Sequence, residues 1–262
     1  MPEILEVELA RSLIEQAALG RVIEQVDAPD AWFLKRGLTP RAVRTALPGR
    51  SIVQARRRGK QLLLDTDHEG PVIGMHLGMS GRVIIDGEAA GDPLVYASNR
   101  DVTEWNRFTL QFADGGRLAL RDPRRLGAVE LDPDEDRLGV DAFALTLSEL
   151  RAIVSRSRAP LKAVLMDQSR IAGLGNLLVD EVLWRAGLDP ARAADSLDAG
   201  EQVRLNRAIR NSLRVLGRRG GSHTGDLMPA RFPGGSCPRD GAALVRRTVG
   251  GRTSYSCPVH QR

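Results

Sequence analysis

The feature that most constrains the fold of this chain is a change of hydrophobic period at the acidic, proline-bearing run 132–136. Before this run, short apolar segments separated by turn residues indicate β-strands, at 61–64, 72–77, 82–85, 108–112, 117–120 and 128–131. The Ala-Asp-Gly-Gly stretch at 113–116 is typical of a β-hairpin. A helical pattern at 3–19 follows Pro2, which suits a helix start. Residues 1–131 therefore predict one helix leading into an antiparallel β-sandwich.

Beyond the run the hydrophobic period becomes helical, with helices predicted at 147–155, 161–167, 177–186 and 199–216. Two glycine-rich turns at 168–176 join the second of these helices to the third, and segments 244–249 and 253–256 suit a terminal hairpin. The predicted fold class is α+β. We expect three parts: a β-domain (1–131), a linker with a helical domain (132–221) and a hairpin region (222–262).

Positive charge is concentrated near the end of the chain. Residues 211–262 hold nine arginines and two aspartates, a balance of +7, whereas the whole chain carries +5. A basic tail indicates a polyanion such as nucleic acid, but an arginine-biased proteome would produce the same solvated basic faces. No apolar run has the length of a membrane span, and the first eight residues lack the features of a secretory signal. We therefore expect no membrane contact and a cytoplasmic location.

Few groups could carry out amine chemistry. Arginine stays protonated, whereas lysine and a terminal amine can be tuned, and only Lys35, Lys60 and Lys162 are lysines. Removal of the initial methionine before a small residue would leave Pro2 as a secondary amine at the positive end of a helix, which favours its nucleophilic form. Beside the carboxyl of Glu3, this amine could form an iminium with a sugar C1′. The alternative is that Pro-Glu is simply a common helix start.

Two Cys-Pro-x-x pairs bracket the terminal hairpin. The first runs from Cys237 to Asp240 and the second from Cys257 to His260. A hairpin with two ligands at each end has the build of a zinc ribbon, and aspartate and histidine are both competent zinc ligands. We favour a structural zinc site over the alternative, a hairpin without metal that is held by apolar packing.

The turn Gly173-Leu-Gly175-Asn176 leads into a predicted helix. Backbone amides at a helix start favour an anion, and an asparagine there can add a donor to a phosphate. Turns of this kind are also common as purely structural elements.

Six ordered motifs and the terminal hairpin span nearly the whole chain. They are Met-Pro-Glu-Ile-Leu-Glu-Val-Glu (1–8), Arg-Gly-Lys-Gln-Leu-Leu-Leu (58–64), His-Leu-Gly-Met-Ser-Gly (76–81), Asp-Pro-Arg-Arg-Leu-Gly (122–127), Ile-Ala-Gly-Leu-Gly-Asn (171–176) and Asp-Glu (180–181). In this order they closely resemble the formamidopyrimidine-DNA glycosylase and endonuclease VIII family of base-excision repair enzymes. The resemblance implies a helix-bearing β-sandwich, a helix-two-turns-helix module and a zinc ribbon.

The same resemblance implies the chemistry. Pro2 would attack C1′ of the damaged nucleoside and form a Schiff base, with Glu3 as the proton donor. Two eliminations would then expel the 3′ and 5′ phosphates. Lys60 matches the family's hairpin lysine in these steps, and Arg252 matches the ribbon arginine, which joins Asn176 in a phosphate clamp and could serve the second elimination.

Further DNA contacts follow from matching positions. Met79 and Arg124 match residues that fill the hole left by a flipped nucleotide. Arg158 aligns with a basic DNA contact ahead of the two-turn motif. Trp105 falls where a DNA-contacting histidine is typical.

Other positions depart from the family. Leu5 replaces a usual second proline, and Leu126 replaces the phenylalanine wedge of the formamidopyrimidine branch. The segment 222–236 is shorter than the loop that caps 8-oxoguanine in its branch. These departures argue against 8-oxoguanine and leave oxidised pyrimidines, ring-opened purines and abasic sites open.

We therefore expect a monomeric DNA glycosylase with abasic-site lyase activity, acting on damaged double-stranded DNA with no cofactor in the chemistry. One alternative is a paralogue that binds damage or abasic sites without excising bases. Another is a protein that binds structured RNA, which would not need Pro2, Glu3 and Lys60 together.

Overall fold

A computed structural model describes residues 2–93 and 98–262, and its contacts divide the chain into two compact units. We call the first the β unit (Pro2 and Glu6–Glu135) and the second the helical unit (Glu3–Leu5 and Asp136–Arg262). The predicted three-part division, with its further boundary at residue 221, stays a prediction. Among the described residues, no helix is long and apolar enough to cross a membrane.

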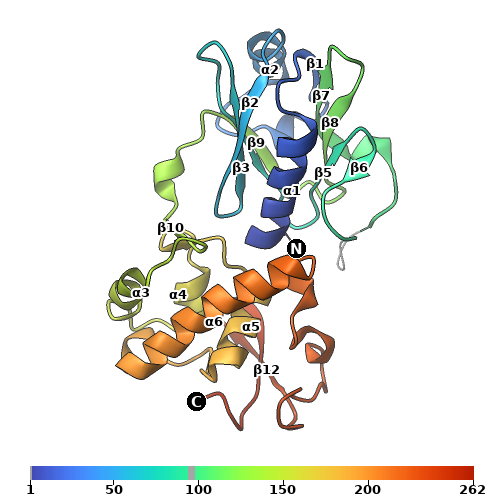
Figure 1. Cartoon of the computed structure of the whole chain (residues 1–262). Helices are drawn as coiled ribbons and strands as arrows, with labels where there is room; N and C mark the ends of the chain where they lie inside the picture. The colour runs from blue at the N-terminus through green and yellow to red at the C-terminus, as the bar shows by residue number, and fades with distance from the viewer. Residues whose placement is uncertain (1, 94–97) are drawn as a thin grey trace. The chain divides into compact units, whose positions relative to one another are not determined.

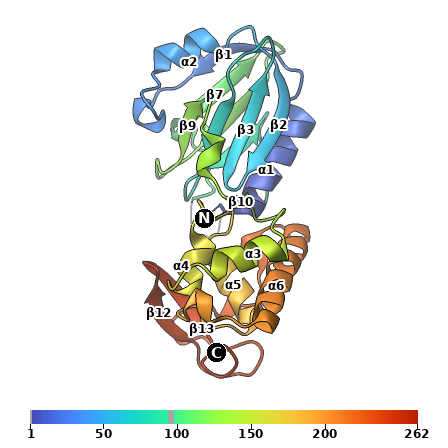
Figure 2. The same cartoon turned by 90° about the vertical axis from the view of Figure 1, so that its left-hand side faces the viewer.

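The β unit contains two antiparallel sheets, with helix α1 (Ile4–Ala17) running beside their strands (Figures 1 and 2). One sheet has the order β1 (Ile23–Asp27), β7 (Asn106–Phe112), β8 (Arg117–Arg121), β5 (Arg82–Ile85) and β6 (Glu88–Ala89). The other has the order β2 (Ile52–Arg58), β3 (Gln61–Thr66), β4 (Ile73–His76) and β9 (Ala128–Leu131). The unit also holds α2 (Pro40–Ala46), η1 (Ala31–Phe33), η2 (Thr103–Trp105) and the start of η3 (Glu135–Arg137).

Buried side chains of both sheets and of α1 form one hydrophobic cluster, which confirms the predicted sandwich. Phe108 and Leu110 of β7 alternate with more polar neighbours, as a half-buried strand requires. Each such fully buried side chain stabilises the fold by about 2 kcal/mol. The pattern did not predict β2, because its Arg-rich sequence buries only Ile52 and Ala55 fully.

The helical unit gathers α3 (Leu147–Val154), α4 (Leu161–Met166), α5 (Asn176–Ala186) and α6 (Ala199–Arg218) around a second cluster (Figure 2). All four were predicted within two residues. Capping boxes start α3 at Thr146 and α6 at Asp198. In each box the capping side chain accepts the backbone N–H of a glutamate three residues later, and the carboxylate of that glutamate accepts the backbone N–H of the capping residue. The unit also contains the parallel pair β10 (Val140–Asp141) and β11 (Ile171–Ala172), with η4 (Ala194–Ser196), η5 (Ser222–Thr224) and η6 (Met228–Ala230).

The predicted terminal hairpin consists of β12 (Val245–Val249) and β13 (Arg252–Ser256). A small cluster that includes Trp184, Leu227 and Tyr255 supports it. Because β13 contacts α5, the hairpin is attached to the helical unit through the helix that follows the glycine-rich turns.

Candidate active site and DNA-binding residues

A carboxylate from near the chain's N-terminus caps α5. Glu3 is completely buried, and its carboxyl oxygens accept hydrogen bonds from the backbone N–H groups of Gly175 (3.0 Å), Leu177 (2.7 Å) and Leu178 (3.1 Å). The first N–H groups of a helix lack intrahelical partners, and the helix dipole favours negative charge there. The anion at this helix start is therefore the protein's own carboxylate, so these three amides are not available to a DNA phosphate.

The two glycines of the turn make room for this segment. A Cβ on Gly175 would lie 2.3 Å from Cδ of Glu3, and a Cβ on Gly173 would lie 2.5 Å from Cδ1 of Ile4. Gly173 also adopts φ +114°, which disfavours other residues. The backbone N–H of Ile4 donates to the Gly173 carbonyl at 3.1 Å. The two glycines of the turn thus leave the space that Ile4 and Glu3 occupy.

Asn176 is the first residue of α5 and is half-buried. Its side-chain Oδ1 is buried and has no hydrogen-bond partner among the described residues. An amide that is not held by the protein is suited to a ligand contact. Because the backbone amides at this helix start bind Glu3, the side chain of Asn176, rather than the backbone of the turn, is the part of the motif that remains for a ligand.

The two predicted arginine contacts of the helical unit are exposed. Arg252 opens β13, and its guanidinium donates to the adjacent Gly251 carbonyl at 3.3 Å. The Arg158 side chain is 95% exposed and lies 3.6 Å from a carboxylate oxygen of Asp195. The Arg252 contact is a long hydrogen bond to a neutral carbonyl, and the Arg158 contact is an exposed ion pair. Both contacts are weak, so both guanidinium groups can exchange them for phosphate.

A buried charged cluster holds the strand that carries Arg252. Lys162 Nζ donates to Asp180 Oδ1 at 2.7 Å and to the Thr253 carbonyl at 2.9 Å, and Arg231 Nε donates to Asp180 Oδ2 at 2.9 Å. Burial lowers the pKa of Lys162, whereas the neighbouring carboxylate of Asp180 acts in the opposite sense. Lys162 lies in α4 and is completely buried.

In the β unit, Lys60 occupies the two-residue turn between β2 and β3. Gly59 beside it adopts φ 57°, which a tight turn requires. The next residue, Gln61, pairs across the sheet with His76. The pKa of His76 lies below its usual range, chiefly because of desolvation and next because of the positive charge of Lys60. The negative charge of Asp122 acts in the opposite direction. A neutral imidazole therefore accompanies Lys60 near neutral pH.

Asp122 organises the loop that carries two predicted DNA contacts. It is completely buried and accepts backbone N–H bonds from Arg124 (3.0 Å), Leu126 (2.8 Å) and Gly127 (2.7 Å), and also the hydroxyl of Ser80. The last bond ties the loop 122–127 to the loop 77–81. Asp122 is the first residue of the motif 122–127, but the motif alone predicted no role for it.

The two loops present the predicted void-filling residues. Met79, Arg124 and Leu126 are all exposed at their tips. The loops also touch, because a Cβ on Gly78 would lie 2.4 Å from the carbonyl carbon of Leu126. The structure therefore brings Met79 and Arg124 into adjoining loops of one unit, as the motif matches required.

Trp105 belongs to the same part of the β unit. Its carbonyl accepts the backbone N–H of Asp122 at 2.8 Å, so its backbone is tied to the start of the loop 122–127. Its ring lies under the guanidinium of Arg100, 5.5 Å from the ring centre. The ring thus offers a partly buried aromatic surface that already binds one cation.

The four predicted metal ligands meet at one point of the helical unit. Their ligand atoms all lie within 4.8 Å of one another. His260 Nδ1 lies 2.7 Å from Asp240 Oδ2, Cys257 Sγ lies 3.2 Å from the same oxygen, and Cys237 Sγ lies 3.8 Å from His260 Nδ1. Four such atoms fit the tetrahedral coordination of zinc.

The surroundings of the two sulfurs also suit a metal. The backbone N–H groups of Arg239 and Val259 each donate to a cysteine Sγ at 3.4 Å, and Trp184 Nε1 donates to Cys237 Sγ at 3.3 Å. Donors around a sulfur favour the thiolate, which is the metal-binding form. Burial raises the pKa of the Cys257 thiol, an effect that a bound cation would offset.

Comparisons with known proteins agree with this arrangement. Residues 1–129 match the family model of the formamidopyrimidine-DNA glycosylase N-terminal domain, and residues 133–226 match that of its H2TH domain. The formamidopyrimidine-DNA glycosylase of Paracoccus denitrificans is 36% identical over 292 aligned positions that cover all of both chains. The enzyme of that name from Arabidopsis thaliana is 30% identical, with all of this chain and 71% of the relative covered.

Solved structures give the same result. The Lactococcus lactis Fpg protein in complex with a THF-DNA and an inhibitor superposes with a TM-score of 0.84 at 25% identity, and both chains are fully covered. The wild-type L. lactis protein with N7-benzyl-Fapy-dG DNA gives 0.84 at 26%. The sandwich, the capped two-turn module and the hairpin define a DNA-repair glycosylase fold. This chain belongs to the formamidopyrimidine-DNA glycosylase family.

Proposed function

We propose that this chain, a DNA glycosylase and abasic-site lyase of base-excision repair, uses the amine of Pro2 as its nucleophile. The observation that carries the proposal is the Glu3 carboxyl, which directly follows Pro2 and is held in place by three backbone bonds at the start of α5. A fixed carboxyl next to an amine supplies the acid and base that covalent catalysis needs.

In the first stage the Pro2 amine takes the place of the damaged base at C1′ of the sugar. The Pro2 nitrogen forms a bond to C1′ of the damaged nucleoside, the bond from C1′ to the base breaks, and the base leaves with the electron pair. Glu3 takes the proton that the amine loses. It then donates this proton to O4′ of the sugar as the ring opens, which leaves an iminium at C1′.

The second stage cleaves the strand. Removal of a proton from C2′ sends an electron pair toward the iminium, and the 3′ phosphate leaves; a second elimination expels the 5′ phosphate. Lys60, in the two-residue turn between β2 and β3, would contact a phosphate near the lesion and serve these eliminations. Arg252 would bind the departing 5′ phosphate together with Asn176, whose side-chain Nδ2 would donate to it.

The substrate is damaged double-stranded DNA, and the protein would act as a monomer. Met79 and Arg124 would fill the space left by the flipped nucleotide, with Trp105 and Arg158 as further DNA contacts. Leu126 is a smaller wedge than phenylalanine and stacks less well on a base pair. We therefore propose ring-opened purines, oxidised pyrimidines and abasic sites as substrates in preference to 8-oxoguanine.

A structural zinc ion would be held by Cys237, Asp240, Cys257 and His260. When bound, zinc fixes the hairpin that carries Arg252 and takes no part in the chemistry. Elemental analysis should find about one zinc per chain, and the Asp240→Ala variant should hold less. Equal zinc content in both proteins would exclude Asp240 as a ligand.

The binding-only alternative is not favoured, because the matched relatives cover the whole chain and are glycosylases. Borohydride reduction with abasic-site duplex DNA should trap a covalent adduct at Pro2, identified by peptide mass spectrometry. A chain with a short N-terminal extension is the matched control, since it keeps the fold but lacks this amine. Lys60→Arg should still form the adduct. An adduct at Lys60, or none with correctly processed protein, would overturn the mechanism.

A further inference from the structure

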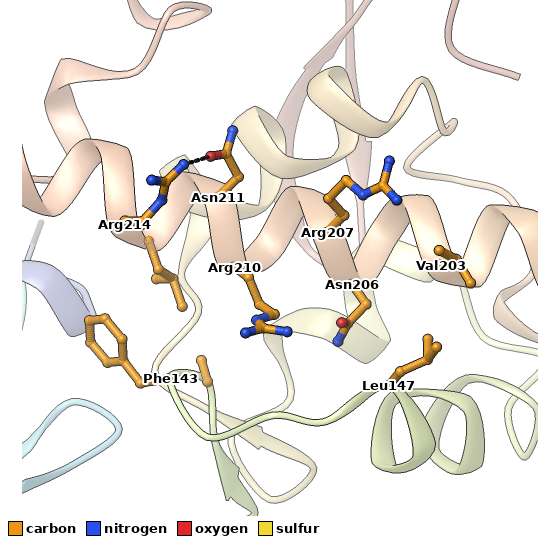
Figure 3. A pocket seen from close by; sticks show the side chains of 10 residues that line it. Phe143, Leu147, Val203, Asn206, Arg207, Arg210, Asn211 and Arg214 are labelled. Atoms are coloured by element: carbon orange, nitrogen blue, oxygen red, sulfur yellow. Dashed lines mark hydrogen bonds between the residues drawn. The ribbon is translucent and has the colours of Figure 1, made fainter.

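A groove in the helical unit lies outside the residues assigned above. It has a volume of about 870 Å³ and is formed by α6 and the segment that leads into α3 (Figure 3). Arg210 and Asn206 extend from α6 toward Phe143 and Leu147, whereas Arg207 extends toward the opposite edge. Arginines of α6 therefore lie on both sides of that helix, and Phe143 and Leu147 supply the apolar part of the groove.

The arginines that line the groove have no carboxylate partner in the part of the chain that the structure describes. Arg207, Arg210 and Arg214 recur at helical spacing on one face of α6 and are all exposed. None of the three forms an ion pair with a described residue, and Arg214 donates to the neutral Asn211 side chain at 2.8 Å. By contrast, Arg192 of the same unit lies 2.6 Å from Glu201. The groove thus offers positive charge without a counter-ion among the described residues.

The remaining lining is suited to an apolar side chain and one hydrogen bond. Phe143 is 47% exposed although it is aromatic, and Leu147 and Val203 are half-buried beside it. Asn206 is 7% exposed, yet its side-chain nitrogen has no hydrogen-bond partner among the described residues. A buried donor without a partner costs stability unless a ligand accepts from it.

We propose that this groove docks an acidic peptide segment of a partner protein, anchored by one apolar side chain. Carboxylates of the segment would pair with Arg207 and Arg210, its apolar side chain would cover Phe143, and a backbone carbonyl would accept from Asn206. A nucleic acid fits less well. Its phosphates could pair with the arginines, but a sugar-phosphate backbone supplies no apolar side chain to pack beside Leu147 and Val203.

The groove is separate from the residues assigned to DNA. Asn176 begins α5, Arg252 begins β13, and Arg158 lies between α3 and α4, whereas the arginines of the groove lie along α6. Changes in the groove should therefore leave strand cleavage intact, so that this inference and the proposed catalytic function can fail independently.

The test is fluorescence anisotropy of the full chain at low salt with a labelled peptide, Asp-Asp-Glu-Leu-Phe-Asp. Arg210→Glu, or Arg210→Gln if the first variant does not fold, should weaken peptide binding about tenfold or more. Arg218→Glu, which makes the same charge change on α6 outside the groove, should change it less than about twofold. A peptide with Ser-Ser in place of Leu-Phe should bind more weakly, and all variants should cleave abasic-site DNA normally.

Several results would overturn the proposal. No binding of the peptide, equal effects of Arg210→Glu and Arg218→Glu, or equal binding of the Ser-Ser peptide would show that the groove has no specific role. If Arg210→Glu weakens binding of single-stranded oligothymidylate but not of the peptide, the groove is a nucleic-acid surface instead.

Discussion

Two buried carboxylates perform the same physical task in the two units, over very different sequence distances. Asp122 binds backbone N–H groups two, four and five residues ahead of it, whereas Glu3 binds N–H groups 172 to 175 residues away. Both stabilise backbone that would otherwise leave donors unsatisfied. The local contact shapes a loop that carries the predicted DNA contacts, and the distant contact holds the proposed catalytic carboxyl at a helix start.

The largest expected effect comes from breaking the distant contact. Glu3→Gln replaces one acceptor oxygen with an NH2 group that faces backbone N–H donors, and it removes the acid and base. Single-turnover base excision should slow about 10²- to 10⁴-fold, and the free energy of unfolding should fall by about 1–3 kcal/mol. Glu15→Gln, an exposed change on α1, is the control. Normal excision by Glu3→Gln would refute the assigned role.

Breaking the local contact should affect duplex recognition more than chemistry. Asp122→Asn should lower the free energy of unfolding by about 1–3 kcal/mol, because it leaves a buried N–H without an acceptor. Excision from duplex DNA should slow, while borohydride trapping on single-stranded abasic DNA should persist, since no hole needs filling there. Ser80→Ala removes one of the four bonds and should have a smaller effect. Equal losses of activity on duplex and on single-stranded DNA would show that Asp122 does not act mainly through duplex recognition.

The third prediction tests why Gly175 is needed. Gly175→Ala should destabilise the protein by about 1–3 kcal/mol, because the new Cβ would overlap the Glu3 carboxyl. In a Glu3→Ala background the same change should cost much less, since the space is then open. A double-mutant cycle from urea denaturation measures this coupling, and additive effects would show that the contact is not responsible.

The smallest effect concerns an exposed carboxylate of the β unit. A hydrogen bond from Arg21 lowers the pKa of Asp114 from 3.8 to about 2. Because the folded-state pKa is depressed, its contribution to stability should be fully present above pH 3.8 and should disappear as the pH falls toward about 2. The difference in urea midpoint between wild type and Asp114→Asn should shrink over this range. A difference that persists at the lowest pH would point to a cause other than the charge.

Local patterns predicted most elements because they depend on neighbouring residues. The α6 helix has a strong apolar face and its own capping box, and the β7–β8 hairpin has its turn residues. Strand β2 was not predicted, because its arginines hide the period. The burial of Lys162 also had no local signal, since its partner Asp180 lies on another helix and the Thr253 carbonyl lies in the hairpin.

The sequence by itself determined the α+β class, the position of the turns and which residues could carry amine, phosphate and zinc chemistry, because these follow from residue type and short spacing. The folded structure was needed to show that the amides at the start of α5 bind Glu3, that Asp122 joins two loops, and that the groove arginines Arg207, Arg210 and Arg214 have no carboxylate partner among the described residues. Such pairings join residues far apart in the chain, and their energy depends on burial and direction, which appear only when the chain is folded.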